Sequence, residues 1–370
     1  MNTSQDKFGG HGRETFERGV IRLVGRGGTN FVHPGLFRPL AASLILAATI
    51  ALSAGAAPPV PEAFVADAPA GRHDTVAQVP MDDGAKLWVK VLGDDLGKPL
   101  LIVHHGAPGV SSHLEPEASF GFLADRYRVL VFDARGSGYS DLKEPYSHER
   151  WVKDVDVLRR WAGADRFVLA GGSYGTFISL EYALRHPEHL DAVILRGPSA
   201  EGPATLNNGL EAALKAVHGD DERQTRMWTG QARDDEDLKV GFEKFAGVFA
   251  PPADKMLPTP ERAAPPARRF PPVFHAATHD WAFSKNLPTY DVRERLGSIH
   301  VPMLVTVGRY DQVTVPAGAE LIAQRVPGAQ LVIFEHAGHS VPADEPAKFQ
   351  ATVNSFLDPV YQRSLAQVPP

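Results

Sequence analysis

The sequence contains no cysteine, and this absence removes several kinds of chemistry at once. Without a thiol, the protein has no cysteine nucleophile, no disulfide bond and no cysteine-ligated zinc. The lack of disulfides does not decide the compartment, because many exported proteins also have none.

The sequence also lacks a long basic run. Its 38 Lys and Arg residues and 44 Asp and Glu residues give a net charge of −6. Proteins that bind nucleic acid present a basic patch, so we expect no nucleic-acid partner. With 370 residues, 43% of them hydrophobic, the chain can bury a large core. One large domain, or one domain that carries an insertion, is therefore expected.

Charged residues are absent between Arg38 and Glu62, where an apolar stretch (40–57) ends in small residues. With basic residues before it and a small-residue site at Ala56, this pattern is typical of an export signal cleaved near Ala56. We therefore predict an exported protein, periplasmic or secreted, with residues 1–70 as leader and linker. The alternatives are a retained N-terminal anchor, which would be the only membrane contact, and a buried core helix.

Beyond residue 70, short apolar runs alternate with helical patterns. Most of these runs are near-continuous Val, Ile and Leu, as expected for parallel strands buried on both faces. Strands that alternate with helices predict an α/β fold with a mainly parallel sheet flanked by helices. The predicted strands are 86–93, 99–106, 127–136, 166–173, 190–197, 301–311 and 329–338, and the predicted helices 148–163, 174–186, 316–326 and 345–357.

One interval breaks this alternation. Residues 198–298 contain helix-like segments and a proline-rich stretch, but no convincing strand. Such a block after a sheet strand is best interpreted as an inserted helical cap with a long irregular loop. The catalytic domain would then comprise residues 71–197 and 299–370.

The sequence Gly171-Gly-Ser173-Tyr-Gly175 lies between a predicted strand and a predicted helix. In so tight a turn a Cβ two residues before or after the serine would clash with the neighbouring helix and strand. The turn would project the Ser173 hydroxyl above the carboxyl edge of the sheet. We therefore predict that Ser173 is a nucleophile and not a structural serine.

A serine needs a histidine base held by a carboxylate, in the chain order Ser, Asp, His. Asp311 follows the strand 301–307, and His339 follows the strand 330–335. The alternatives are a turn-forming role for Asp311 and His336 as the base. Because Gly338 and Ser340 place His339 in a tight turn, we favour His339.

Backbone donors for the oxyanion are expected in the small-residue loop 103–113, directly after a strand. We predict the N–H groups of Ala107 and Tyr174, with Gly106 as the alternative to Ala107. The spacing His275-x-x-x-His279 lacks the glutamate of a zinc motif, so we expect no metal and no cofactor. Asp133-x-Arg135 is interpreted as bracing, with Arg135 bonded to neighbouring carbonyls.

The chain resembles the α/β-hydrolase fold and, more narrowly, the proline iminopeptidase-like serine peptidases. The resemblance spans roughly residues 80–358 and rests on motifs in the family's order. These are His105-Gly-Ala-Pro-Gly109, Asp133-Ala-Arg135-Gly136-Ser-Gly138-Tyr-Ser140, Gly171-Gly-Ser173-Tyr-Gly175, Leu195-Arg196-Gly197, Gly308-Arg-Tyr-Asp311 and Gly338-His339-Ser340.

The resemblance implies a helical cap between the sixth and seventh strands and a free-amine substrate held by cap carboxylates, one of them in a Trp-Glu-Gly motif. The nearest match here is Trp228-Thr229-Gly230, in which threonine replaces that glutamate. A neutral hydroxyl does not pair with an ammonium as a carboxylate does. Glu236, Glu243 or the acidic run 234–237 could take its place.

These observations predict a cofactor-free serine hydrolase, monomeric or weakly oligomeric, that forms an acyl-enzyme on Ser173. The substrate expected from the resemblance is a small peptide from which an N-terminal proline or another small residue is released. The alternatives are a small ester or lactone substrate and, more remotely, a non-catalytic binding protein on the same fold.

Overall fold

The computed structural model describes residues 72–258, 261 and 272–365, and all of them belong to one compact unit. The predicted signal segment, its cleavage near Ala56 and the linker lie outside the described residues. In the described part of the chain, no helix is long and apolar enough to cross a membrane.

An eight-stranded sheet forms the centre of this unit, in the order β1-β2-β4-β3-β5-β6-β7-β8. The pairs β1–β2 and β2–β4 are antiparallel, and the other neighbours are parallel, which confirms the predicted α/β fold with a mainly parallel sheet. The strands are β1 Thr75–Pro80, β2 Lys86–Leu92, β3 Leu100–His104, β4 Arg128–Phe132, β5 Phe167–Gly172, β6 Leu190–Arg196, β7 Met303–Gly308 and β8 Gln330–Phe334. The sequence did not predict β1.

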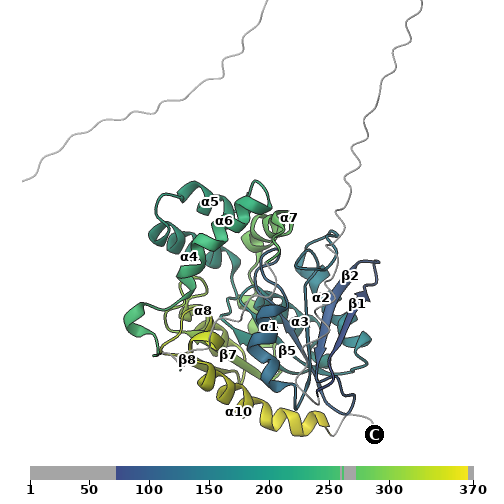
Figure 1. Ribbon diagram of the computed structural model, residues 1–370. Helices are drawn as coiled ribbons and strands as arrows, with labels where there is room; N and C mark the ends of the chain where they lie inside the picture. The colour runs from purple at the N-terminus through teal and green to yellow at the C-terminus, as the bar shows by residue number, and fades with distance from the viewer. Residues whose placement is uncertain (1–71, 259–260, 262–271, 366–370) are drawn as a thin grey trace, which may run out of the picture. The chain divides into compact units, whose positions relative to one another are not determined.

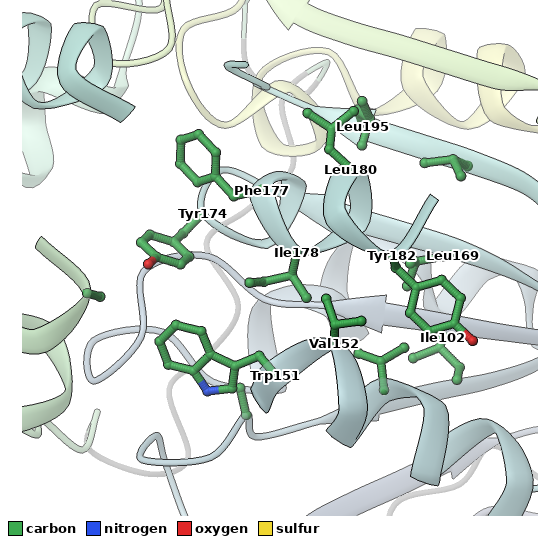
Figure 2. Close-up of a cluster of buried hydrophobic side chains, with 14 of the residues drawn as sticks. Ile102, Trp151, Val152, Leu169, Tyr174, Phe177, Ile178, Leu180, Tyr182 and Leu195 are labelled. Atoms are coloured by element: carbon green, nitrogen blue, oxygen red, sulfur yellow. The ribbon is translucent and has the colours of Figure 1, made fainter. Parts of the chain in front are cut away.

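The central strands of the sheet are buried on both faces, which explains why they are apolar without alternation. In β3, Leu100 and Ile102 join one hydrophobic cluster, whereas Leu101 and Val103 join another. Successive side chains of a strand point to opposite faces, so the two clusters lie on opposite sides of the sheet. Figure 2 shows part of the first cluster. The first cluster includes side chains of α2 (His148–Trp161), α3 (Gly175–Arg185) and α8 (Pro316–Arg325), and the second includes side chains of α1 (Leu114–Phe120) and α10 (Pro346–Leu365).

Where it is described, the chain between β6 and β7 consists of helices joined by irregular segments, with one isolated bridge between Glu201 and Asp291. Figure 1 shows α4, α5, α6 and α7 grouped at one end of the sheet. These helices are α4 Gly202–Ala216, α5 Asp221–Trp228, α6 Asp235–Phe245 and α7 Ala276–Trp281, and the remaining helical elements of the unit are η2 Gly121–Leu123, η3 Pro187–His189, η4 Ala246–Phe249, η5 Ala253–Lys255, η6 Ala282–Asn286, η7 Leu287–Thr289, η8 Arg293–Ser298 and α9 Val341–Asp344. The exact domain boundaries stay predictions.

Two residues of the acidic run at the start of α6 make contacts within the helical insertion. Asp234 caps the helix, because its carboxylate accepts the N–H of Asp237 at 2.8 Å. The Asp237 carboxylate binds Arg226 of α5 at 2.8 Å and Arg223 at 3.0 Å. The bond from Arg226 contributes most to holding the pKa of Asp237 below its usual value. This pairing joins α5 to α6, so Asp234 and Asp237 are committed to local structure.

Candidate active site

Ser173 lies in the sharp turn between β5 and α3. Its φ of 51° is in the left-handed region, and no other described residue except glycine has a positive φ. A Cβ on Gly171 would lie 2.5 Å from the carbonyl oxygen of Gly175, and a Cβ on Gly175 would lie 2.6 Å from that of His104. Only glycine fits at either position, so the expected reason for the two glycines is confirmed.

Asp311 and His339 meet beyond the carboxyl ends of β7 and β8. His339 Nδ1 lies 2.7 Å from Asp311 Oδ2, and both side chains are buried. The carboxylate accepts the hydrogen of Nδ1, which leaves Nε2 with a free lone pair. The imidazole is thus held in the tautomer whose Nε2 can accept a proton.

Thr314 is a further member of this group that the sequence analysis did not identify. Its hydroxyl donates to Asp311 Oδ2 at 2.8 Å and lies 3.3 Å from His339 Nδ1. The backbone N–H groups of Val313 and Thr314 donate to Asp311 Oδ1 at 2.9 and 3.0 Å. A threonine three residues after an aspartate is a local signal for such a turn.

The segment η4 contacts the same histidine from the inserted helical region. Phe249 accepts the backbone N–H of His339 at 2.8 Å, and its ring stacks on the imidazole at a centroid distance of 4.9 Å. A Cβ on Gly338 would lie 2.2 Å from the Phe249 carbonyl oxygen, so this close approach requires glycine. No sequence signal links residues 90 positions apart.

His336, the other candidate base, lies elsewhere. Its Nδ1 is 3.0 Å from the carbonyl oxygen of Lys255, and its backbone N–H donates to Glu345. The side chain is exposed and does not line the pocket described below. The structure therefore brings His339 to Asp311 and leaves His336 at the surface.

The N–H groups of Ala107 and Tyr174 are free for an oxyanion, since neither donates a hydrogen bond within the described part of the chain. His105 orients the peptide between Gly106 and Ala107. Its Nε2 accepts the N–H of Ala134 at 2.9 Å, so Nδ1 carries the hydrogen and donates to the Gly106 carbonyl at 3.0 Å. Because C=O and N–H of one trans peptide point in opposite directions, this bond directs the Ala107 N–H away from His105.

The Tyr174 side chain anchors the turn that carries the second N–H group. Its hydroxyl lies 2.8 Å from His148 Nε2 and 3.3 Å from Asn286 Nδ2. Burial lowers the pKa of His148 to about 3, so this imidazole is neutral. Figure 2 shows Tyr174 among Trp151 and Phe177. The aromatic packing holds the first turn of α3 in place.

One pocket, with a volume of about 50 Å³, is lined by Ser173, His339, Ala107 and Tyr174. Gly106 is not in the lining, but a Cβ on it would lie 3.5 Å from the Cβ of Ser173. The sheet side of this pocket comes from the turns after the strands, and the opposite side comes from the helical insertion. Most of its lining is aromatic or aliphatic. The remaining lining residues are Val110, Phe177, Thr205, Met227, Trp228, Phe242, Phe245, Phe249, His279, Phe283, Leu287, Val313 and Thr314.

The predicted amine-binding residues are not brought to this pocket, apart from Trp228. Thr229 is not among the lining residues, and its hydroxyl donates to the Thr225 carbonyl of its own helix at 2.7 Å. Glu236 is exposed and pairs with Lys239, and Glu243 is also exposed. Their distance from the lining follows from helix geometry, because both point to the solvent side of α6.

Two other motifs have structural roles. Arg135 was expected to bond carbonyls, and it donates to the Lys143 carbonyl at 3.1 Å. It also pairs with the carboxylates of Asp154 at 2.9 Å and Asp83 at 2.7 Å, which were not expected. Burial opposes ionisation of Asp133, yet its bonded neighbour His113 holds the pKa of that carboxyl below its usual value. Both pairs brace the loop after β4.

The two histidines of the spacing His275-x-x-x-His279 point to different partners. His275 Nε2 lies 3.2 Å from the Gly138 carbonyl, and His279 Nδ1 lies 3.2 Å from Asp280 Oδ1. Among the residues that the structure describes, no three His, Asp or Glu side chains are grouped as a metal site would require.

Comparison with known proteins agrees with this geometry. Residues 99–346 match the alpha/beta hydrolase fold family. The chain is 28% identical to the proline iminopeptidase PfmaB of Pestalotiopsis fici, over 75% of this chain and 97% of that protein. It is 27% identical to a proline iminopeptidase of Saccharolobus solfataricus, over 72% of this chain and 87% of that protein. A hydrolase from Pseudomonas aeruginosa has a similar structure, with a TM-score of 0.59, 29% identity and coverage of 78% of this chain and 100% of its own.

Proposed function

This chain belongs to the alpha/beta hydrolase fold family, and from that membership and the geometry of the site we propose that it is a serine hydrolase that forms an acyl-enzyme on Ser173. One observation carries the proposal. Ser173, in its strained turn, lines the same pocket as His339, whose Nδ1 lies 2.7 Å from Asp311. A nucleophile, a base and a carboxylate that orients the base are the groups that such a reaction requires.

The proposed reaction assigns one role to each group. Ser173 Oγ attacks the substrate carbonyl carbon while His339 Nε2 takes the hydroxyl proton, and Asp311 stabilises the resulting imidazolium. The N–H groups of Ala107 and Tyr174 donate to the oxyanion. His339 then gives its proton to the leaving amine or alcohol, and water attacks the acyl-enzyme by the same route in reverse.

Peptides with an N-terminal proline or another small residue are the first candidate substrates. The names of the relatives support this assignment, because proline iminopeptidases match the chain over 72% or more of its length. Their identities of 28% and 27% support shared catalytic machinery.

Carboxylic esters are the second candidate, and the pocket favours them. No Asp or Glu side chain of the described residues lines the pocket. A free amine of a peptide would therefore have no carboxylate partner beside Ser173.

Labelling with a fluorophosphonate tests the proposed nucleophile. We expect one label per chain, located at Ser173 by mass spectrometry, and no label in Ser173→Ala. Ser199→Ala, which removes a buried serine after β6, is the control and should label like the parent. Equal labelling of parent and Ser173→Ala, or no labelling of either, would contradict the proposal. Prolyl, alanyl and N-blocked prolyl arylamides and a short aryl ester then define the substrate.

A further inference from the structure

We infer that the pocket beside Ser173 takes a small, uncharged, apolar acyl group, so that the substrates are short-chain carboxylic esters without a free amine on the acyl side. This inference rests on the proposed serine hydrolase function, because it concerns the acyl group that Ser173 would receive. The inference depends on side chains from the helical insertion. The sequence did not predict that these side chains would exclude a charged substrate.

Aromatic rings from four elements form the pocket wall opposite Ser173. Trp228 of α5 packs on Phe283, with ring centroids 5.7 Å apart, and Phe245 of α6 packs on Trp228 at 5.1 Å. Phe249 continues the row to His339. The three pairs among these Trp and Phe rings meet edge to face, and such a wall offers apolar surface and few hydrogen-bond acceptors.

Three carboxylates of the neighbouring helices already have partners. Asp280 Oδ1 lies 3.2 Å from His279 Nδ1 and accepts the N–H of Ala232 at 3.2 Å. Asp235 accepts the N–H of Ala276 at 2.7 Å. Asp237 is held by two arginines of α5, as described above. None of these three side chains lines the pocket.

His279 is a titratable residue that lines the pocket together with His339. Its ring stacks on Phe283 at a centroid distance of 4.1 Å, and its side chain is only 2% exposed. Burial lowers the pKa of His279 more than Asp280 raises it. Burial therefore favours the neutral imidazole, which has no charge to pair with an ionic substrate.

The balance of effects disfavours an ammonium group in this pocket. A buried charge without a partner weakens binding by a factor on the order of a hundred or more. Cation–π contact with the surrounding rings strengthens binding by a factor on the order of ten. Each buried methylene of an apolar acyl group, by contrast, strengthens binding about fourfold.

The size of the pocket limits the acyl chain. Its volume is about 50 Å³. A cavity of about 150 Å³ holds benzene, and about 10–15 Å³ of such volume holds one water. The pocket therefore encloses an acyl group of a few carbons, and a long fatty acyl chain would extend beyond it.

A pair of size-matched esters tests the exclusion of charge. The 4-nitrophenyl esters of isobutyric acid and of alanine have acyl groups of equal shape, but the alanyl amine is cationic at pH 6. We expect kcat/KM, divided by each ester's rate of alkaline hydrolysis, to be about a hundredfold higher for the isobutyryl ester. An equal or higher value for the alanyl ester would overturn the inference.

A chain-length series with two variants tests the assignment to this pocket. For 4-nitrophenyl esters from acetate to octanoate, we expect the parent to prefer four carbons or fewer. Phe242→Ala, which removes a half-buried ring from the lining, should raise the octanoate-to-butyrate ratio of kcat/KM about tenfold. Phe122→Ala, which removes a partly buried ring far from the lining, should leave this ratio unchanged. An unchanged ratio in Phe242→Ala, with the fold intact by circular dichroism, would overturn the inference.

Measuring Ser173→Ala with the same esters separates the two proposals. If its activity equals that of the parent, the proposed function fails and the inference fails with it. If Ser173→Ala is inactive while the parent prefers the alanyl ester, only the inference fails.

Discussion

Ser173 is the residue at which this fold accepts backbone strain. A side chain in the left-handed region costs about 1–2 kcal/mol, and a glycine there would relieve it. The turn is held by the donation of the Ser173 N–H to the Arg196 carbonyl at 2.8 Å and by the packing of Tyr174. Strain retained by surrounding bonds is characteristic of functional positions.

Thr314 acts on the proposed reaction through Asp311. Three donors converge on this carboxylate besides His339, two of them backbone N–H groups and the third the Thr314 hydroxyl. They hold the two carboxylate oxygens in fixed directions, so that one of them faces His339 Nδ1.

Thr314→Val should lower kcat for a short aryl ester about tenfold, because a hydrogen bond to a buried charged group is worth about 1.5–3 kcal/mol. The matched control is Thr306→Val in β7, where the hydroxyl donates to the Leu195 carbonyl and touches no residue of the site. We expect kcat of this control within twofold of the parent. Steady-state kinetics of both variants check the prediction, and equal kcat values for them would contradict it.

At the scale of elements, the contact between α4 and α5 shapes the pocket. Gly209, in the middle of α4, lies against the ring of Trp228, and a Cβ at this position would be 2.2 Å from the ring atoms. A glycine in a helix interior is unfavourable by itself. Here it permits the close approach that places Trp228 in the pocket lining.

Gly209→Ala should destabilise the protein although alanine is the better helix former. Alanine gains about 1 kcal/mol of helix propensity, but overpacking costs about 1–3 kcal/mol and displaces Trp228. We expect a lower Tm and a lower kcat/KM. Gly247→Ala is the matched control, because no atom lies within 4 Å of a Cβ there, and it should leave Tm unchanged or higher. Differential scanning calorimetry compares the two, and a raised Tm in Gly209→Ala would contradict the argument.

At the scale of the whole molecule, buried neutral histidines make stability depend on pH. Burial lowers the pKa of His104 and of His148 to about 3. In the unfolded chain a histidine binds a proton below about pH 6.5, so between about pH 6.5 and pH 3 the unfolded state holds more protons. Stability is therefore full above pH 6.5 and is lost as the pH falls through this window.

His148→Phe should reduce this pH dependence. Each such histidine contributes about 1.4 kcal/mol per pH unit to the slope of the free energy of unfolding against pH, and the variant removes one of these histidines. Phenylalanine is compatible with the neighbouring rings of Phe177 and Tyr290. Urea denaturation between pH 4 and pH 7 measures the slope, with His218→Gln at an exposed position as the control. A slope in His148→Phe equal to that of the control would contradict the assignment.

Much of the site could be predicted from the sequence because its signals are local. Gly171, Ser173 and Gly175 lie within five residues, and Asp311 and His339 each follow an apolar strand. The contacts that were missed join distant parts of the chain. Phe249 contacts His339 across 90 residues, and Arg135 pairs with Asp83 in addition to the expected bond to a neighbouring carbonyl.

The sequence by itself determined that Ser173, Asp311 and His339 each follow a buried strand and so belong at one sheet edge, because buried parallel strands and glycine-flanked turns leave a readable pattern. The order of the strands in the sheet came from the structure. Only the tertiary structure decided what surrounds those side chains. The hydroxyl of Thr229 bonds within its own helix, although this residue lies in the predicted amine-binding motif. The side chains of Glu236 and Glu243 are exposed and point away from the pocket. The direction of a side chain on an inserted helix depends on how that helix packs, and packing is set by contacts between residues distant in the chain.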